Sequence, residues 1–236
     1  MEVESNNDAG DTREDTIRQG ATIAIGVPAP NADLYRYKAT NPVLHFLVEN
    51  PYAKQTIREL SRLTDYSHPA VKNAVDVLAA NDIVHVEAEG NQKQISINRS
   101  RITKPDDSVL TIPQPEFHAP VREAVGQLRS TLDDVKGIIV FGSVARGTAD
   151  RQSDIDLWVL VQEDRGTNQR QANEIAKTVE NERFSGDRYE FQILVESARS
   201  ALNVGDRLTE ILISGITIVD TQTLDRFKQE VLDDAG

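Results

Sequence analysis

Two apolar runs joined by a short polar segment limit what the second half of this chain can fold into. Residues 137–141 (GIIVF) are typical of a buried strand, and residues 155–161 (IDLWVLV) alternate into a second one. The segment between them opens with Gly142-Ser143, after which we expect a short helix. Helices are predicted over 121–132, 168–183, 198–202 and 208–213 and from residue 221, and further strands over 189–195 and 216–219. This alternation predicts a small mixed-sheet α/β domain over residues 121–236.

The polar segment ends in two carboxylates that the second strand would aim at one point. Asp154 and Asp156 are two residues apart, so on a strand their side chains share a face. Two such carboxylates repel each other unless a cation lies between them, and oxygen ligands of this kind suit Mg²⁺. Gly142 lets the backbone approach a phosphate closely, and the Ser143 hydroxyl and nearby amides can hold its oxygens. A phosphate cradle and a metal pair are the two parts that phosphoryl or nucleotidyl transfer requires.

The same residues carry a family resemblance. Gly-Ser, ten residues and Asp-x-Asp, with Arg146-Gly147 between them, resemble the DNA polymerase β-like nucleotidyltransferase superfamily. The stretch GSVARGTADRQSDIDLWVLV is similar to the minimal nucleotidyltransferases that act as antitoxins beside HEPN ribonuclease toxins, and to drug-modifying nucleotidyltransferases. The resemblance implies that Asp154 and Asp156 bind two Mg²⁺ ions, with Mn²⁺ as an alternative, and that Gly142 and Ser143 hold the triphosphate of an NTP.

The resemblance also implies a third carboxylate on a later strand, flanked by apolar residues. Tyr189-Glu190-Phe191 fits this pattern, so Glu190 is the expected third acid and metal ligand, which could help to deprotonate the attacking hydroxyl. Arg146 either contacts phosphate or caps local structure. The four histidines show no ligand spacing, and Trp158 is expected in the core.

The first half of the chain has a different rhythm. Three short helices are predicted from residue 41, over 56–63 and over 67–80, followed by a hairpin whose turn is Glu89-Gly90-Asn91-Gln92. This order resembles a winged helix-turn-helix, with the third helix as the recognition helix. The side chains expected to face DNA are Arg58, His68, Lys72, Asn73 and Lys93, supported by Lys54 and Gln55. The alternative is a module used for dimerisation or partner docking.

These patterns divide the chain into four parts. We expect a disordered acidic tail and arm over residues 1–35, the winged helix-turn-helix over 36–104, a linker over 105–120 and the nucleotidyltransferase domain over 121–236. The overall fold class is therefore α+β.

Charge and composition indicate which partners and which cellular environment to expect. The formal net charge is -12, yet residues 36–104 contain ten Lys/Arg against seven Asp/Glu, which suits a module that contacts nucleic acid. Strong acidity with few lysines resembles proteins of salt-loving archaea, in which charge alone could not drive DNA binding. Cysteine is absent, which excludes disulfides and thiolate metal sites. No membrane-spanning run and no signal peptide is evident, so we expect a cytoplasmic protein.

Two functions remain open at this stage. The first is a metal-dependent enzyme that moves a nucleoside monophosphate, AMP from ATP, to an acceptor hydroxyl with release of pyrophosphate. The resemblance offers a partner toxin, a small molecule or tRNA ends as acceptors, and favours an antitoxin or regulatory role. The second is a non-enzymatic transcription regulator whose second domain senses a nucleotide or forms a homodimer.

Overall fold

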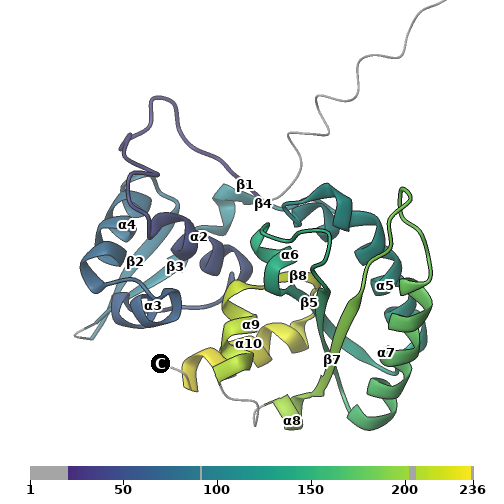
Figure 1. Cartoon of the computed structure of the whole chain (residues 1–236). Coiled ribbons are helices and arrows are strands. Elements are labelled where there is room, and N and C mark those ends of the chain that lie inside the picture. The colour runs from purple at the N-terminus through teal and green to yellow at the C-terminus, as the bar shows by residue number, and fades with distance from the viewer. Residues whose placement is uncertain (1–20, 91, 202–205, 235–236) are drawn as a thin grey trace, which may run out of the picture.

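The structure is a computed structural model that describes residues 21–90, 92–201 and 206–234 (Figure 1). The acidic tail expected over residues 1–20 lies outside these described residues. The arm that follows contains the short strand β1 (Thr22–Ile23), which pairs antiparallel with β4 (Ile102–Thr103).

Three helices and a hairpin follow the arm, and we call them the N-terminal module. They are α2 (Thr40–Glu49), α3 (Ile57–Thr64), α4 (His68–Ala80), β2 (Val84–Glu89) and β3 (Gln92–Ile97). The predicted order of three helices and a hairpin is confirmed. At the start of α3, the Thr56 hydroxyl accepts from the Glu59 N–H, and the Glu59 carboxylate accepts from the Thr56 N–H at 2.6 Å. This capping box fixes where α3 begins. Ser67 precedes α4 as expected, but its side chain makes no capping bond.

The second half of the chain forms a four-stranded mixed sheet in the order β7-β6-β5-β8. Its strands are β5 (Val135–Phe141), β6 (Ile155–Val161), β7 (Phe191–Ser197) and β8 (Ile216–Val219). Strands β6 and β7 are parallel, whereas β5 runs antiparallel to both β6 and β8. The helices are α5 (His118–Thr131), α6 (Gly142–Arg146), α7 (Arg165–Glu180), α8 (Ala198–Ala201), α9 (Asp206–Ser214) and α10 (Gln222–Asp234). The α+β class is thereby confirmed.

Two helix pairs cover the two faces of this sheet (Figure 1). Helices α5 and α7 pack on one face, where Val121 and Val179 are fully buried. Helices α9 and α10 pack on the other, where Trp158 is 1% exposed and stacks on Phe227 with ring centroids 5.9 Å apart. Trp158 is therefore a core residue, as predicted. Asp156 is two residues before Trp158 on β6, so its side chain points to this second face.

Two predicted boundaries differ from the structure because side chains intervene. Helix α7 starts at Arg165, three residues early, because the Asp164 carboxylate caps it by accepting from the Thr167 N–H at 3.2 Å. Strand β7 starts at Phe191, two residues late, because the chain before it forms a turn in which Phe184 and Asp187 pair.

The segment expected to be a linker packs into the protein. Residues 105–120 contain two 3₁₀ turns, η2 (Ser108–Thr111) and η3 (Pro115–Phe117), and a third, η1 (Arg99–Arg101), precedes them. Val109, Ile112 and Phe117 are buried in the core between the sheet and α5. The prolines and the weak apolar periodicity of this segment predict a linker. Only the tertiary packing shows that its apolar side chains anchor it in the core.

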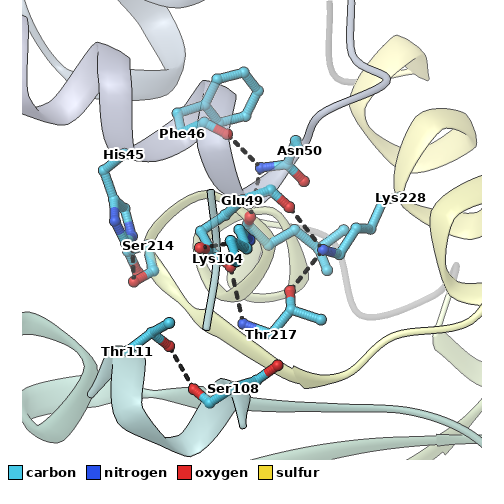
Figure 2. Close-up of polar contacts among 11 residues, drawn as sticks. His45, Phe46, Glu49, Asn50, Lys104, Ser108, Thr111, Ser214, Thr217 and Lys228 are labelled. Carbon is cyan, nitrogen blue, oxygen red and sulfur yellow. Dashed lines mark hydrogen bonds and ion pairs between the residues drawn. The ribbon is translucent and has the colours of Figure 1, made fainter. Parts of the chain in front are cut away.

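The N-terminal module and the sheet are joined by a buried polar cluster (Figure 2). The Glu49 carboxylate at the end of α2 accepts from Lys104 Nζ at 2.9 Å and from the Thr217 N–H of β8 at 3.0 Å. The ammonium of Lys228 on α10 donates to the Glu49 carbonyl at 2.9 Å and to the Thr217 hydroxyl at 2.7 Å. Because Glu49 and Lys228 are 5% and 3% exposed, these bonds form in a low-dielectric interior.

The edge strand β7 is closed by side chains of α7. The Gln169 carboxamide donates to the Ile193 carbonyl and accepts from the Val195 N–H, both at 2.8 Å, as a neighbouring strand would. The Glu180 carboxylate accepts from the Phe191 N–H at 3.0 Å. These contacts satisfy backbone groups that would otherwise form an open edge.

We expect Gln169→Ala to lower the free energy of unfolding by about 1–3 kcal/mol, because it leaves backbone groups of β7 without these partners. Urea denaturation of Gln169→Ala measures the loss, and Arg170→Ala, at an exposed neighbouring position, is the matched control. Equal stability of the two variants would show that water replaces the carboxamide at no cost.

In the described part of the chain, every helix is too short or too polar to cross a bilayer.

Candidate active site

The site begins where β5 ends and α6 starts. Gly142 adopts φ +70°, the left-handed region that glycine enters without strain. A Cβ built on Gly142 would lie 2.1 Å from Oδ2 of Asp156, because Phe141 and Asp156 are directly paired across β5 and β6. A glycine is thus required for the start of α6 and the carboxylate to lie in contact. Ser143 follows in the first turn of α6 and is partly exposed.

The two aspartates open strand β6. Asp154 is exposed and precedes the strand, and Asp156 is its second residue and half-buried. The turn before them is held by Asp150 and Ser153, since the Ser153 hydroxyl donates to the Asp150 carboxylate at 2.9 Å. Burial and then the charge of Asp154 raise the pKa of Asp156, while Arg207 and Arg146 oppose this rise. A carboxyl whose ionisation is disfavoured by burial and by a neighbouring carboxylate is suited to binding a cation.

Glu190 lies next to the pair but does not close a triad. Strands β6 and β7 pair Ile155 with Phe191, so the residues just before them, Asp154 and Glu190, are neighbours. The Ile155 N–H donates to the Glu190 carbonyl at 2.8 Å, which fixes this backbone approach. The Glu190 side chain is exposed. Over residues 21–90, 92–201 and 206–234, no three His, Cys, Asp or Glu side chains gather closely enough to hold a metal ion.

The cations near Asp156 come from two helices. Arg146 ends α6 and was predicted as a phosphate contact. Arg207 in the first turn of α9 also acts on Asp156, and sequence reasoning missed it. Its only sequence signal is a place at the start of a helix far along the chain, and packing of α9 on the sheet brings it back to the site. Anionic phosphates between these guanidinium groups would be stabilised.

The chemistry of the donors fits a divalent metal at the aspartate pair. Asp154 and Asp156 offer carboxylate oxygens close to each other. A bound cation would offset the repulsion by which Asp154 raises the pKa of Asp156. Gly142, Ser143, Asp154 and Asp156 together form what we call the transfer site.

We expect Gly142→Ala to abolish any chemistry at the transfer site while the chain still folds. The new methyl group must displace the Asp156 carboxylate and adds strain of roughly 1–2 kcal/mol at φ +70°. Gly90→Ala is the matched control, because Gly90 also has a left-handed φ of +59° but meets no atom within 4 Å. Comparing metal binding and unfolding of both variants separates the lost site from backbone strain. Unchanged metal affinity in Gly142→Ala would contradict the assigned contact.

The residues expected to face DNA divide into two groups. Arg58, His68 and Lys93 line one groove of about 440 Å³ between α3, the start of α4 and the hairpin, together with Arg62, and we call it the basic groove. Lys72 and Asn73 are exposed further along α4, where Lys72 pairs with Asp76 at 2.6 Å.

The two residues expected to support this surface, Gln55 and Lys54, differ in exposure. Gln55 is 2% exposed, and its backbone pairs with Ile95 of β3, so the prediction that it helps to face DNA is wrong. Lys54 is exposed and pairs with Glu87 of β2 at 3.0 Å.

Comparison with known proteins gives one family match and one similar solved structure. Residues 121–204 match the family model of the nucleotidyltransferase domain. This match spans β5, α6, β6, α7, β7 and α8, including every residue of the transfer site. No curated protein matches the chain. A solved crystal structure of a toxin-antitoxin with AMP-PNP is similar at 20% identity with a TM-score of 0.37, covering 51% of this chain and 86% of that one.

Proposed function

We propose that this chain is a metal-dependent nucleotidyltransferase that moves a nucleoside monophosphate, AMP from ATP, to an acceptor hydroxyl. The observation that carries the proposal is the contact between Gly142 and the Asp156 carboxylate, which brings a phosphate-binding turn against a metal-binding pair. The family match over residues 121–204 supports it. The catalytic domain would extend over residues 121–236.

In the proposed reaction the acceptor oxygen attacks the α-phosphorus of the NTP, and the bond from that phosphorus to the bridging oxygen of pyrophosphate breaks. Ser143 and the amides at the start of α6 would hold the triphosphate, with Arg146 and Arg207 balancing its charge. When bound, two Mg²⁺ ions, or Mn²⁺, would supply charge neutralisation at the transferred and leaving phosphates. Asp154, Asp156 and Glu190 would hold them, and Glu190 would accept the proton of the attacking hydroxyl.

We propose further that residues 36–104 form a winged helix-turn-helix that binds DNA through the basic groove and α4. Arg58, His68 and Lys93 line that groove together, which supports this assignment. Pairing of two copies through the N-terminal module would match a two-fold operator. Such a protein would act as an antitoxin or regulator with a toxin as protein partner, and a salt-loving source would explain the charge of -12.

One observation favours the alternative of a non-enzymatic regulator. Among the residues that the structure describes, the aspartate pair gathers no third ligand, and Glu190 is exposed beside it. A site with two carboxylates could bind a nucleotide and metal without turning over, and so report nucleotide to the DNA-binding module.

Incubation of the purified chain with NTPs labelled on the α-phosphate, Mg²⁺ and a panel of acceptors tests both functions. The panel contains a partner protein encoded nearby, RNA, DNA and small alcohols, at moderate and high salt. Label on an acceptor that disappears in Asp154→Ala/Asp156→Ala supports the enzyme. Nucleotide binding without label on any acceptor supports the regulator instead.

A further inference from the structure

A pocket of about 620 Å³ lies between the N-terminal module and the sheet, and we call it the inter-module pocket. One wall comes from α2 and the end of α3, with His45, Arg62 and Asp65. The opposite wall comes from α6 and α9, with Arg146, Thr209 and Glu210. Neither half of the chain forms this pocket alone.

The wall on the sheet side shares helix α6 with the transfer site. Arg146 is the last residue of α6, the helix that starts with Gly142 and Ser143. Arg207, which also acts on Asp156, precedes the pocket residue Thr209 by two positions on α9. Helices α6 and α9, which form this wall, therefore each carry an arginine that acts on Asp156.

The opposite wall leads to the basic groove. Arg62 lines the inter-module pocket and also the basic groove, in which Arg58 and Lys93 lie. Helix α3 thus borders both the basic groove and the inter-module pocket. Arg58 lines the groove, Arg62 lines both, and Arg146 lines the pocket. Successive phosphate groups of one nucleic-acid strand could therefore bind a cation both in the basic groove and in the inter-module pocket.

The lining also suits the rest of a nucleotide unit. Leu63, Ile213 and Pro42 offer apolar surface for a flat ring, and the carboxylates of Asp65 and Glu210 can accept from ring amines or sugar hydroxyls. The volume lies within the range that holds a small ligand. Phosphate-binding arginines, apolar surface and hydrogen-bond acceptors together favour a nucleotide over a simple anion.

The seam that contains this pocket is held in one geometry. Helix α9 is tied to α2 by Asn50, whose side chain donates to the Leu212 carbonyl at 3.2 Å, and by His45, which bonds to the Ser214 carbonyl at 3.3 Å (Figure 2). The buried cluster around Glu49 lies beside these bonds. A ligand that spans the seam would find its two walls already placed, which lowers the cost of binding.

The geometry points to the inter-module pocket as a binding site for the end of a single-stranded nucleic acid whose adjoining phosphates lie in the basic groove. The N-terminal module then supplies one wall of the acceptor site, in addition to any contact with duplex DNA. The terminal hydroxyl of the strand would attack the α-phosphorus at the transfer site, and pyrophosphate would leave. This inference rests on the proposed function only for that last step, because binding of the strand does not require transfer.

The first test measures binding alone. A single-stranded oligonucleotide labelled with a fluorophore at its 5′ end is titrated, at low and high salt, with the full chain carrying Asp154→Ala/Asp156→Ala. Adding Thr209→Trp, which fills the pocket without touching the groove, is expected to weaken binding about tenfold or more, and so is Arg62→Glu. Arg170→Glu, a charge reversal on the exposed side of α7, is the matched control and is expected to leave affinity unchanged. Equal affinity of all variants, or no binding of the oligonucleotide, overturns the inference.

The second test separates this inference from the proposed function. In the otherwise unaltered chain, Thr209→Trp is expected to raise KM for the oligonucleotide while Mg²⁺-dependent NTP binding stays as it was. Label that goes only to a protein or a small alcohol leaves the transferase intact but overturns the terminal hydroxyl of the strand as the acceptor. Strand binding that depends on the pocket, with no label on any acceptor, upholds the site and removes the transferase.

Discussion

Replacing Asp154 and Asp156 by alanine is expected to abolish nucleotide transfer and to leave the fold intact. Asp156 of β6 lies against the start of α6, Asp154 just before that strand acts on its pKa, and transfer of a charged phosphoryl group depends on the cations that the pair would hold. We expect a loss on the order of a thousandfold or more in kcat/KM, equivalent to about 4 kcal/mol of transition-state stabilisation. The measurement is transfer of label from the α-phosphate of an NTP.

The stability of a neutral variant of Asp156 shows whether a loss of activity comes from the site or from the fold. The pKa of Asp156 is raised in the folded protein, first by burial and then by Asp154, so its ionised form is disfavoured there. At pH values above that raised pKa, Asp156→Asn should therefore unfold at higher urea concentration than the unaltered chain. A variant that loses activity while gaining stability has lost chemistry rather than its fold.

Two further variants assign the remaining acid. Glu163→Gln, an exposed carboxylate beyond the far end of β6, is the matched control and should keep full activity. Glu190→Gln should lower kcat roughly a hundredfold if Glu190 takes the proton of the attacking hydroxyl. Full activity of Glu190→Gln would remove Glu190 from the site, and full activity of the aspartate double variant would overturn the transferase altogether.

The second large effect is expected at the buried cluster that joins the N-terminal module to the sheet. Glu49→Gln removes the largest of the opposite charges that act on the buried ammonium of Lys228 and leaves only Asp220 and Asp225 to compensate it, and this should lower the free energy of unfolding by on the order of 3 kcal/mol. Lys228→Met removes that ammonium, so the double variant should recover part of the loss. Lys177→Met is the control, because the ion pair between Lys177 and Glu174 is exposed on both sides and screened by water.

The effect of Glu49 should depend on pH in a defined direction. Burial by itself would raise the pKa of Glu49, but Lys104, the Thr217 N–H and Lys228 together hold it below the ordinary value of 4.5. A carboxylate whose pKa is lowered in the folded state stabilises the protein fully above its unfolded pKa and loses this contribution as the pH falls below it. The gap in unfolding free energy between the unaltered chain and Glu49→Gln should therefore narrow below about pH 4.5. A gap that stays constant into acid would show that Glu49 contributes by shape rather than by charge.

Much of the fold follows from short-range patterns in the sequence. The strands β5, β6 and β8 and the helices α3 and α4 lie where apolar periodicity and capping residues predict them, since these signals depend on neighbours only a few positions apart. The contact between Gly142 and Asp156 belongs to the same class. A glycine after one strand and an aspartate near the start of the next become partners once those strands pair, and the spacing alone brings them together.

Other features depend on residues that are distant in the sequence. Arg207 reaches Asp156 because α9 packs on the sheet, and Gln55 turns inward because its backbone pairs with Ile95. In the sequence, Glu49 and Lys228 resemble ordinary surface residues of two amphipathic helices. They are buried because both bond to Thr217 of β8, which lies between the helices. Local pattern thus determined the elements and the aspartate pair with its glycine. Only tertiary packing decided which cations surround the pair, which polar residues are buried, and that one pocket is built by both halves, because burial and charge depend on what the rest of the chain brings alongside.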